Sequence, residues 1–207
     1  MTGHIRLALF GASGAGKSTT SGLLLQALAR TQVRAAVEKL AEPLYEVQRQ
    51  VYALCGKAMA DPYEQDGVLL ASLADNFRRI DPNSLTKHFA ARITQAEQRG
   101  VQVVICDDMR KPDVAELVAL GFRTVRISAP DRLRIARRAR RGDLSDVSDS
   151  HSAEQEVLIE PDIDIFNDGS MTQLAQQVDS AVELILGWLV QPQTSGPVHA
   201  QRFGSGQ

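Results

Sequence analysis

A glycine-rich segment near the N-terminus has the composition and spacing of a phosphate-binding loop. Its residues, Gly11-Ala12-Ser13-Gly14-Ala15-Gly16-Lys17-Ser18, match the pattern G-x-x-x-x-G-K-[ST] between an apolar strand-like run and a helical pattern. Small residues let successive backbone N–H groups turn towards phosphates, and a lysine at this place reaches the β- and γ-phosphates of a nucleotide. We predict that this loop, together with Thr19, binds ATP and that Ser18 ligates Mg²⁺. A tight glycine turn with a surface lysine is the structural alternative.

Two adjacent aspartates and an arginine follow a second apolar run. The run Val101 to Cys106 (VQVVIC) is typical of a buried parallel strand, and Asp107, Asp108 and Arg110 come directly after it. In open α/β sheets, ligands bind at this carboxyl edge. We predict that one of the aspartates, with Asp107 as our candidate, holds Mg²⁺ directly or through water, and that Arg110 makes bidentate hydrogen bonds to a phosphate. An Asp-Asp turn with an exposed arginine is the alternative.

Arginines are concentrated in one predicted helix. Six of them fall between residues 132 and 141, and the i, i+3, i+4, i+7 spacing puts four on one face: Arg134, Arg137, Arg138 and Arg141. Like charges at this spacing repel one another, and a polyanion such as a triphosphate would relieve the repulsion. We therefore predict a lid over residues 132–153 whose arginines neutralise transition-state charge and exclude water. A solvated basic face paired with nearby acids and an RNA-binding patch are the alternatives.

The elements that must position these side chains alternate between strands and helices. We predict strands at residues 5–10, 33–37, 101–106, 122–128 and 162–166. Helices are predicted from Lys17, over 112–120 and 130–141, and from Ser170, where Gln173 completes a capping box. This alternation predicts an α/β fold of three layers, with a five-stranded parallel sheet between helices. Residues 41–100 are predicted to form several helices, and the length of this insertion suggests a substrate-binding subdomain.

Length and composition limit the class of protein. At about 150 residues per domain, a chain of 207 residues indicates one elaborated domain, which we place at 1–190. Residues 191–207 lack periodicity and are expected to be disordered. With 43% hydrophobic residues, 23% charged residues and a net charge of −2, the chain is neither a coiled coil nor a collagen-like chain nor a strongly basic nucleic-acid binder.

Cysteine usage and hydropathy suggest where the protein works. The two cysteines, Cys55 and Cys106, provide no disulfide framework and no metal-ligand spacing, so we expect a reducing, cytoplasmic location. No stretch approaches about 18 consecutive apolar residues, and no charged region with a long apolar run stands at the N-terminus. We therefore expect no membrane span and no signal peptide.

The region before the last predicted helix argues against a guanine-nucleotide switch. A GTPase of the Ras type is expected to carry the sequence N-K-x-D after a late strand, whereas this chain has Asn167-Asp168-Gly169-Ser170 there. The chain instead resembles the nucleoside monophosphate kinase group of P-loop phosphotransferases, and within it the phage-type deoxynucleoside monophosphate kinases and the animal-type phosphomevalonate kinases. The likeness spans most of residues 5–190, and its residues are the phosphate loop, Ala41-Glu42-Pro43-Leu44, Asp108-Met109-Arg110, Arg137 and Arg138, His151 with Glu154, and Asn167 to Ser170.

This resemblance implies a five-stranded parallel core with a lid and an acceptor-binding region. It implies that residues 41–100 hold the phosphoryl acceptor, with Glu42, Arg78, Arg79 and Arg110 as candidate contacts. It also implies that Asn167 lies near the donor adenine, and we expect Arg134 to contact the same nucleotide from the lid. Arg78 and Arg79 have an alternative interpretation as solvated helix charges. The short signatures of adenylate kinases are not obvious in this chain.

The acceptor decides the chemistry of the reaction. A monophosphate needs no strong general base because its oxygen is already ionised, so positioning and charge neutralisation by Lys17, Mg²⁺ and the lid arginines would suffice. A hydroxyl acceptor would need a carboxylate base, which Asp107 or Asp108 could supply. We expect an ATP- and Mg²⁺-dependent kinase of a small phosphorylated acceptor, a (deoxy)nucleoside monophosphate. The alternatives are a kinase of a non-nucleotide metabolite and a nucleotide-dependent regulator that binds RNA or protein, and the sequence leaves monomer and homodimer open.

Overall fold

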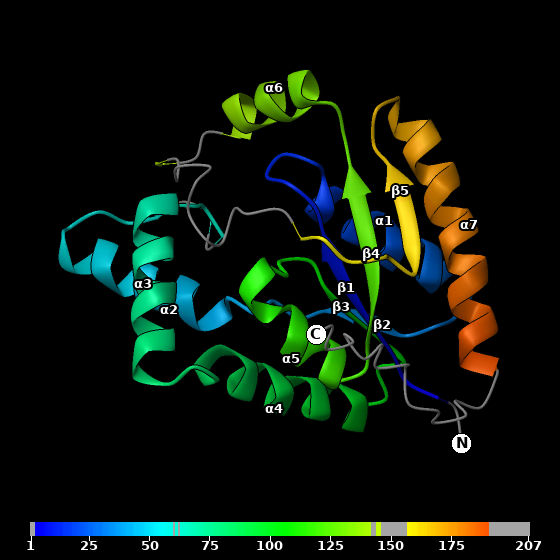
Figure 1. Ribbon diagram of the computed structural model, residues 1–207, viewed down its shortest axis with the longest axis horizontal. Coiled ribbons are helices and arrows are strands. Elements are labelled where there is room, and N and C mark those ends of the chain that lie inside the picture. Colours follow the sequence, from blue (N-terminus) through cyan, green and yellow to red (C-terminus); the bar gives the residue numbers. More distant parts are fainter. Residues whose placement is uncertain (1–2, 60, 62, 142–143, 146–156, 191–207) are drawn as a thin grey trace, which may run out of the picture.

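One parallel sheet organises the protein. The computed structural model describes residues 3–59, 61, 63–141, 144–145 and 157–190. Within these residues the strands are β1 (Ile5–Phe10), β2 (Ala35–Val37), β3 (Val103–Cys106), β4 (Phe122–Ser128) and β5 (Ile163–Phe166). They form a five-stranded sheet in the order β2-β3-β1-β4-β5, and every neighbouring pair is parallel (Figure 1). The predicted α/β fold with a five-stranded parallel sheet is confirmed.

Helices follow the strands in the predicted alternation. In the described part of the chain they are α1 (Lys17–Arg30), α2 (Glu42–Leu54), α3 (Gly67–Ile80), α4 (Ser84–Gln98), a 3₁₀ turn (Lys111–Asp113), α5 (Val114–Ala119), α6 (Asp131–Arg141) and α7 (Met171–Val190). The capping box expected before α7 is present, because the Ser170 N–H donates to Gln173 Oε1 at 2.8 Å and the Gln173 N–H donates to Ser170 Oγ at 3.3 Å.

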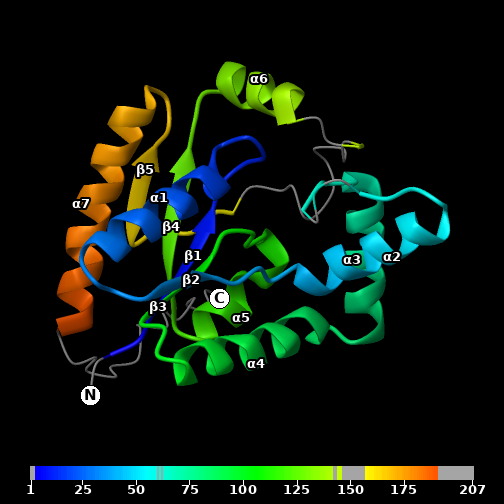
Figure 2. The ribbon, with the colours of Figure 1, turned by 180° about the vertical axis from the view of Figure 1, so that it is seen from behind.

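Both faces of the sheet are buried, and the side-chain period of two divides the core into two layers. In β1, Ile5, Leu7 and Leu9 pack in the cluster that contains α1 and α7. Ala8 and Phe10 pack in the second cluster, which contains α4 and α5. Figures 1 and 2 show these helices on opposite sides of the sheet. Continuous apolar runs are what a parallel strand covered on both faces requires.

Three strands begin later than the sequence predicts, β2 and β3 by two residues each and β5 by one. The predicted second strand starts at Val33, but β2 starts at Ala35 because the end of α1 uses the preceding backbone groups. The Val33 N–H donates to the Leu28 carbonyl at 3.1 Å, and Gln32 has a positive φ of 62°. The third strand starts at Val103, where the Gln102 and Val103 N–H groups both donate to the Arg34 carbonyl. Helix-terminal hydrogen bonds therefore shorten β2 at its start.

The insertion between β2 and β3 consists of helices α2, α3 and α4. Figure 1 shows α2 and α3 projecting to one side of the sheet, while α4 returns beneath it. Asp66 starts α3 by accepting a hydrogen bond from the Leu69 N–H at 3.1 Å. Residues 144–145, beyond α6, lie beside this start: the Gly67 N–H donates to the Ser145 carbonyl at 3.1 Å. The C-terminal side of the arginine helix is thus joined to the insertion.

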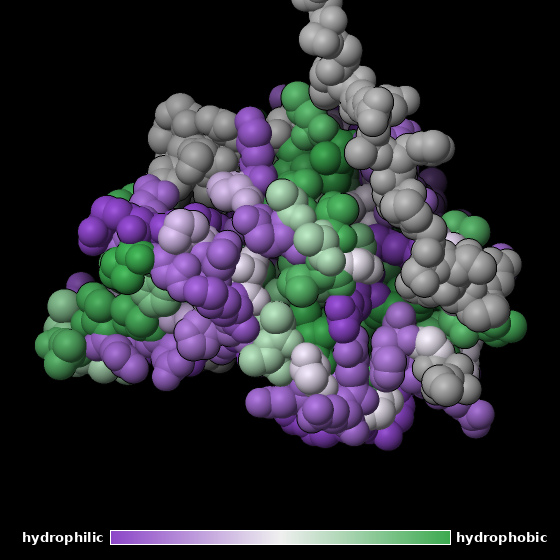
Figure 3. All heavy atoms as spheres, turned by 60° about the horizontal axis from the view of Figure 1, so that its bottom comes forward, coloured by the Kyte–Doolittle hydropathy of each residue, from purple (hydrophilic) through white to green (hydrophobic). Residues whose placement is uncertain are grey.

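The surface carries both polar and apolar side chains. With the bottom of Figure 1 brought forward, hydrophilic side chains cover much of this face, while hydrophobic ones form a band through its middle and further groups near its left and right edges (Figure 3). Such a mixture is ordinary for a folded domain. Across the described residues, every helix falls short of the length and apolarity needed to span a bilayer. The predicted tail at 191–207 and most of the predicted lid beyond α6 lie outside the described residues.

Candidate active site

The phosphate loop connects β1 to α1, and several of its positions are too crowded for any residue but glycine. Gly14 and Gly16 have φ angles of +81° and +103°, a region that L-residues with side chains rarely adopt. A Cβ atom on Gly16 would lie 2.1 Å from Asn167 Nδ2, and one on Gly14 would lie 2.5 Å from the Arg134 carbonyl oxygen. Two segments distant in sequence therefore approach the loop closely, and each carries a residue that we predicted to bind the nucleotide.

Lys17 and the two following hydroxyl residues lie in the first turn of α1. Lys17 Nζ donates to the Gly11 carbonyl at 2.7 Å and to the Ala12 carbonyl at 3.4 Å, so its ammonium group lies against the loop. Ser18 and Thr19 are exposed. The N-terminus of a helix favours anions through its free N–H groups and its dipole. The loop therefore combines a cation, a helix N-terminus and two accessible hydroxyls, which is the chemistry that a polyphosphate requires.

Helix α6 and the residue after β5 contact the loop directly. Arg137 donates to the Ala15 carbonyl at 3.4 Å and to both the carbonyl and Oδ1 of Asn167 at 3.1 Å. Asn167 is buried and donates from Nδ2 to the same Ala15 carbonyl at 2.8 Å. Arg134 donates to the Ser13 carbonyl at 3.4 Å. Two of the four arginines predicted to share a face thus point at the phosphate loop.

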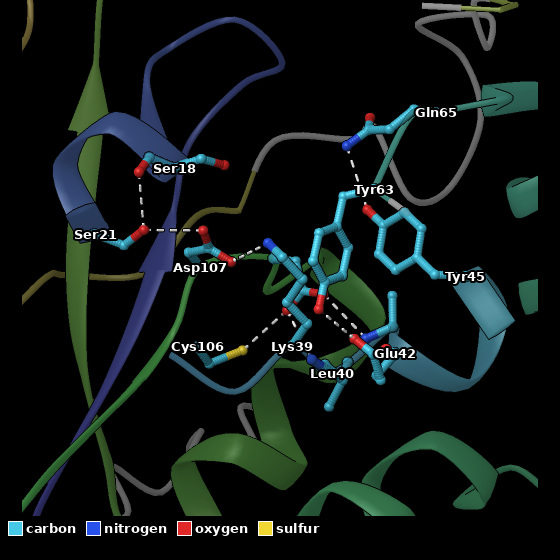
Figure 4. Close-up of polar contacts among 12 residues, drawn as sticks. Ser18, Ser21, Lys39, Leu40, Glu42, Tyr45, Tyr63, Gln65, Cys106 and Asp107 are labelled. Atoms are coloured by element: carbon cyan, nitrogen blue, oxygen red, sulfur yellow. Dashed lines mark hydrogen bonds and ion pairs between the residues drawn. The ribbon is translucent and has the colours of Figure 1, made fainter. Parts of the chain in front are cut away.

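Asp107 follows β3 and lies beside the helix that begins with the phosphate loop. Its carboxylate is almost completely buried, with 2% of the side chain exposed. Oδ2 accepts a hydrogen bond from Ser21 Oγ at 3.0 Å, and Oδ1 accepts one from Lys39 Nζ at 2.8 Å (Figure 4). The Ser18 carbonyl lies 3.0 Å from Ser21 Oγ and is a second possible acceptor for the single hydroxyl proton. Asp107 is therefore linked to the first turn of α1, the turn that carries the predicted metal ligand Ser18.

Asp108 points elsewhere, although it is the next residue. Its Oδ1 accepts from the Leu40 N–H at 2.9 Å and its Oδ2 from the Ala41 N–H at 3.0 Å. The Cys106 thiol also donates to Oδ1, at 3.2 Å. Both carboxylate oxygens are thus occupied by the backbone that leads into α2. The geometry gives Asp108 a role in holding the insertion against the sheet, whereas Asp107 remains close to the phosphate loop.

A cleft of about 380 Å³ opens between the ends of β2 and β3 and the insertion. Ordinary ligand pockets have roughly 300–1,000 Å³. Its lining residues come from three parts of the chain: Val37, Glu38, Lys39, Glu42, Tyr63, Arg92 and Asp107. Asp107 therefore belongs both to the cleft and to the surroundings of the phosphate loop. A ligand in the cleft would therefore lie close to any group bound at the phosphate loop.

The polar side chains of the cleft are paired with one another. Arg92 Nε donates to Glu38 Oε2 at 3.3 Å, and the Tyr63 hydroxyl donates to Glu42 Oε2 at 3.1 Å (Figure 4). Lys39 Nζ lies 5.2 Å from the centre of the Tyr63 ring, within the range of a cation–π contact. The cleft thus offers carboxylates, cations and an aromatic face to a polar ligand.

The carboxylates change the pKa values of two neighbouring groups. Burial by itself would lower the pKa of Lys39, but the ion pair and hydrogen bond with Asp107 outweigh it and raise that pKa above its usual value. Burial, with the charge of Asp108, raises the pKa of the Tyr45 hydroxyl to about 12. Tyr45 packs edge-on against Tyr63 with ring centres 5.4 Å apart. At neutral pH, Lys39 is therefore charged and Tyr45 is neutral.

Of the four predicted acceptor contacts, Glu42 lines the cleft, whereas the three arginines do not. Arg78 makes a 2.6 Å ion pair with Asp113, a carboxylate whose pKa is raised because burial outweighs the attraction of Arg78. Arg79 is exposed and donates to Asn76 Oδ1 at 3.3 Å. Arg110 is half-buried, and its N–H donates to Asp113 Oδ2 at 3.2 Å. The structure thus gathers Arg78 and Arg110 around one buried carboxylate.

Other predicted residues cannot be placed in the site. Arg138 is half-buried on α6, and the side chain of Arg141 lies outside the described part of the structure. His151 and Glu154, which contribute to the family resemblance, also lie outside the described residues.

Several residues of the site are absent from the sequence-based set, among them Ser21, Lys39 and Tyr63. Ser21 stands three positions after Ser18, a spacing that puts both on one helical face and would have revealed it. Lys39 follows β2 closely, and the carboxyl edge of a parallel sheet is where ligand contacts gather. The position of Tyr63 in the cleft depends on how the insertion folds, and no local pattern in the sequence indicates that position.

The donor set at the loop suits a magnesium ion. Mg²⁺ prefers oxygen ligands and usually binds one or two protein oxygens together with substrate phosphates and waters. The Ser18 hydroxyl is exposed, and the Asp107 carboxylate is joined to the same helical turn through Ser21. In the described residues, no three His, Cys, Asp or Glu side chains cluster as a metal site. An ion held by Ser18 and Asp107 would complete its coordination with phosphate oxygens and waters.

Comparisons with known proteins return distant structural similarities. No protein-family model matches the chain, and no curated protein matches its sequence. Among solved structures, a sugar kinase from Janibacter sp. HTCC2649 is 19% identical, with 89% of this chain and 95% of that chain covered and a TM-score of 0.47. The Mycobacterium tuberculosis APS kinase CysC, in complex with AMPPNP and APS, is 14% identical (coverage 90% and 99%, TM-score 0.47). The Aquifex aeolicus shikimate kinase is 17% identical (coverage 89% and 97%, TM-score 0.46).

Proposed function

We propose that this protein is a P-loop phosphotransferase that transfers the γ-phosphoryl group of ATP to a small phosphorylated acceptor, a nucleoside or deoxynucleoside monophosphate, and forms the diphosphate. One observation carries the proposal: Asp107 is shared between the surroundings of the phosphate loop and the 380 Å³ cleft. A donor on the loop and an acceptor in the cleft would thus be neighbours. Holding two reactants in such proximity is a large part of what a kinase contributes.

The roles of the residues follow from their chemistry. Lys17 and the loop N–H groups would bind the β- and γ-phosphates, and Ser18 with Asp107 would hold Mg²⁺. Bound there, Mg²⁺ supplies neutralisation of negative charge on the transferring phosphoryl group. Arg134, Arg137, Arg138 and Arg141 would add positive charge from α6. Since a monophosphate oxygen is already ionised near neutral pH, the cleft needs to orient the acceptor and has no need to deprotonate it.

A second candidate is favoured by the carboxylates of the cleft. Glu38 and Glu42 both line it, and a carboxylate beside a bound hydroxyl would act as a general base. A kinase of a hydroxyl-bearing metabolite would use the same loop and the same aspartate. The regulatory alternative with an RNA-binding arginine face has less support, because Arg134 and Arg137 donate to the phosphate loop and to Asn167.

The test is ADP formation from ATP and Mg²⁺ with a panel of ribo- and deoxynucleoside monophosphates, phosphomevalonate and hydroxyl acceptors. Lys17→Ala serves as the control for contaminating kinases. Turnover with one monophosphate that disappears in the variant supports the proposal. Turnover with a hydroxyl compound alone supports the second candidate. ATP hydrolysis that no acceptor changes, together with salt-sensitive RNA binding, would contradict both.

A further inference from the structure

Lys39 occupies one of the two carboxylate oxygens of Asp107 through which a metal ion could bind. The Lys39 ammonium group is 2.8 Å from Asp107 Oδ1, and Ser21 Oγ donates a hydrogen bond to Oδ2 at 3.0 Å. Only 18% of the Lys39 side chain and 2% of the Asp107 side chain are exposed. A buried carboxylate without a counter-charge is strongly unfavourable. Lys39 therefore neutralises Asp107 when no other cation is bound.

Lys39 also faces the acceptor cleft, of which it forms part of the lining. Figure 4 shows its side chain passing between Asp107 and the ring of Tyr63. The flexible four-carbon stem of lysine lets the ammonium group move between nearby partners. Away from Asp107, the ammonium would still lie at the cleft, where the other cation of the lining, Arg92, is paired with Glu38. Lys39 is thus the cation best placed to serve two partners in turn.

We propose that Lys39 and Mg²⁺ compete for the Asp107 carboxylate, and that Mg·nucleotide binding releases Lys39 to bind the anionic group of the acceptor. The inference rests on the proposed function. It requires direct coordination of Mg²⁺ by Asp107, since a metal held through water would leave the ion pair intact. No covalent bond changes: one cation replaces another on a carboxylate. Because binding couplings are reciprocal, Mg·nucleotide and acceptor would each tighten the binding of the other by the same factor.

The size of the effect follows from the occupancy of the ion pair. If Lys39 is paired with Asp107 in at least about nine-tenths of the molecules, the carboxylate is available to bind Mg²⁺ in about one-tenth of them or fewer. Removing the competitor then tightens apparent Mg²⁺ affinity about tenfold or more. Lys39→Met removes the charge and keeps the length, and Lys39→Arg keeps a cation. Lys87→Met is the matched control, because Lys87 is 64% exposed, is paired with Asp81 and does not line the cleft.

The first measurement is ADP binding as a function of Mg²⁺ concentration, together with the melting temperature with and without Mg·ADP. We expect Lys39→Met to melt lower than the wild type without ligand, to gain more from Mg·ADP, and to reach half-saturation at about tenfold less Mg²⁺. Lys39→Arg and Lys87→Met should resemble the wild type. Equal Mg²⁺ midpoints and equal gains in Lys39→Met and the wild type would overturn the inference.

The second measurement uses inorganic phosphate as a probe of the acceptor site, with Mg²⁺ and the non-hydrolysable analogue AMPPNP filling the phosphate loop. Phosphate should bind the wild type at least about tenfold more tightly with Mg·AMPPNP than without it, and Lys39→Met should lose this coupling. Coupling that survives in Lys39→Met would overturn the acceptor half of the inference. Wild-type protein that fails to bind Mg·ADP would overturn the proposed function itself, whereas normal binding with unchanged Mg²⁺ midpoints overturns this inference alone.

Discussion

The adjacent residues Asp107 and Asp108 offer a sharp test of the site, because the structure gives them different partners. In Asp108→Asn, the amide keeps one acceptor oxygen, so one of the two N–H groups of Leu40 and Ala41 loses its partner. A hydrogen bond to a charged group contributes roughly 1.5–3 kcal/mol. For a chain of this size, each kcal/mol shifts the melting temperature by about 2–4 °C. We expect Asp108→Asn to melt about 3–12 °C below the wild type.

The same variant should keep its metal-dependent nucleotide binding, since the partners of Asp108 belong to the insertion. Asp107→Asn is the comparison: it retains an acceptor for Ser21 and loses the negative charge that would hold Mg²⁺. We expect Mg²⁺ to strengthen ADP binding in Asp108→Asn as in the wild type, within about twofold. In Asp107→Asn this strengthening should fall by at least about tenfold, which is roughly 1.4 kcal/mol.

The assay is thermal unfolding in the presence of a chelator, followed by calorimetric titration of ADP with and without Mg²⁺. One result would refute the reasoning: an Asp108→Asn protein with an unchanged melting temperature and a lost response to Mg²⁺. That outcome would mean that Asp108 faces the metal and that its contacts with the Leu40 and Ala41 N–H groups contribute little.

Three further predictions concern the surroundings of the site. Arg78→Ala leaves a buried carboxylate unpaired and should lower the free energy of unfolding by roughly 2–4 kcal/mol, whereas Arg79→Ala, at an exposed position, should change it by less than about 0.5 kcal/mol. The Tyr45 hydroxyl has a higher pKa in the folded protein than in the unfolded chain, so its contribution to the free energy of unfolding is fully present below pH 10. That contribution, up to about 3 kcal/mol, is lost as the pH rises towards 12, and Tyr45→Phe should reduce the loss. Gly16→Ala should weaken ADP binding at least about tenfold, because its Cβ atom would overlap Asn167 Nδ2 and its φ is positive.

Each of these predictions has a measurement and a contrary result. Denaturant unfolding of the two arginine variants decides the first, and equal stability of Arg78→Ala and the wild type would contradict it. Tyrosinate absorbance decides the second: the difference between wild type and Tyr45→Phe should titrate near pH 12, and a midpoint at pH 10 would contradict burial of this hydroxyl. Titration with ADP decides the third, and wild-type affinity in Gly16→Ala would show that the loop tolerates a side chain there.

Much of the scaffold could be predicted because its signals are local. The phosphate loop is a continuous motif whose glycines and lysine are adjacent in the chain, and the structure places it between β1 and α1 as expected. Apolar and β-branched runs marked the strands, most clearly in β3, whose four residues are all buried because both faces of the sheet are covered. The predicted limits of 5–10 and 122–128 are those of β1 and β4. The limits near Val33 were wrong because hydrogen bonds that end α1 extend past the helix.

The candidate site could be predicted only in part. That Asp107 and Asp108 follow a central strand was evident from the sequence, and the carboxyl edge is where ligands gather. Which of them faces the phosphate loop depends on contacts with α1 and with the start of α2, both distant in sequence. The expectation that Arg78 contacts the acceptor came from resemblance, and the structure pairs this side chain with Asp113.

The sequence by itself determined the phosphate loop, the alternation of strands and helices and the edge of the sheet at which chemistry must occur, since each depends on residues close together in the chain. Only the tertiary structure decided that Lys39 neutralises Asp107, that Tyr63 reaches Glu42 and that Arg137 and Asn167 meet at the loop. The physical reason is that a polar side chain buried by folding must find a partner from whatever segment packs against it. Packing brings those segments together across sequence separations that no local pattern records.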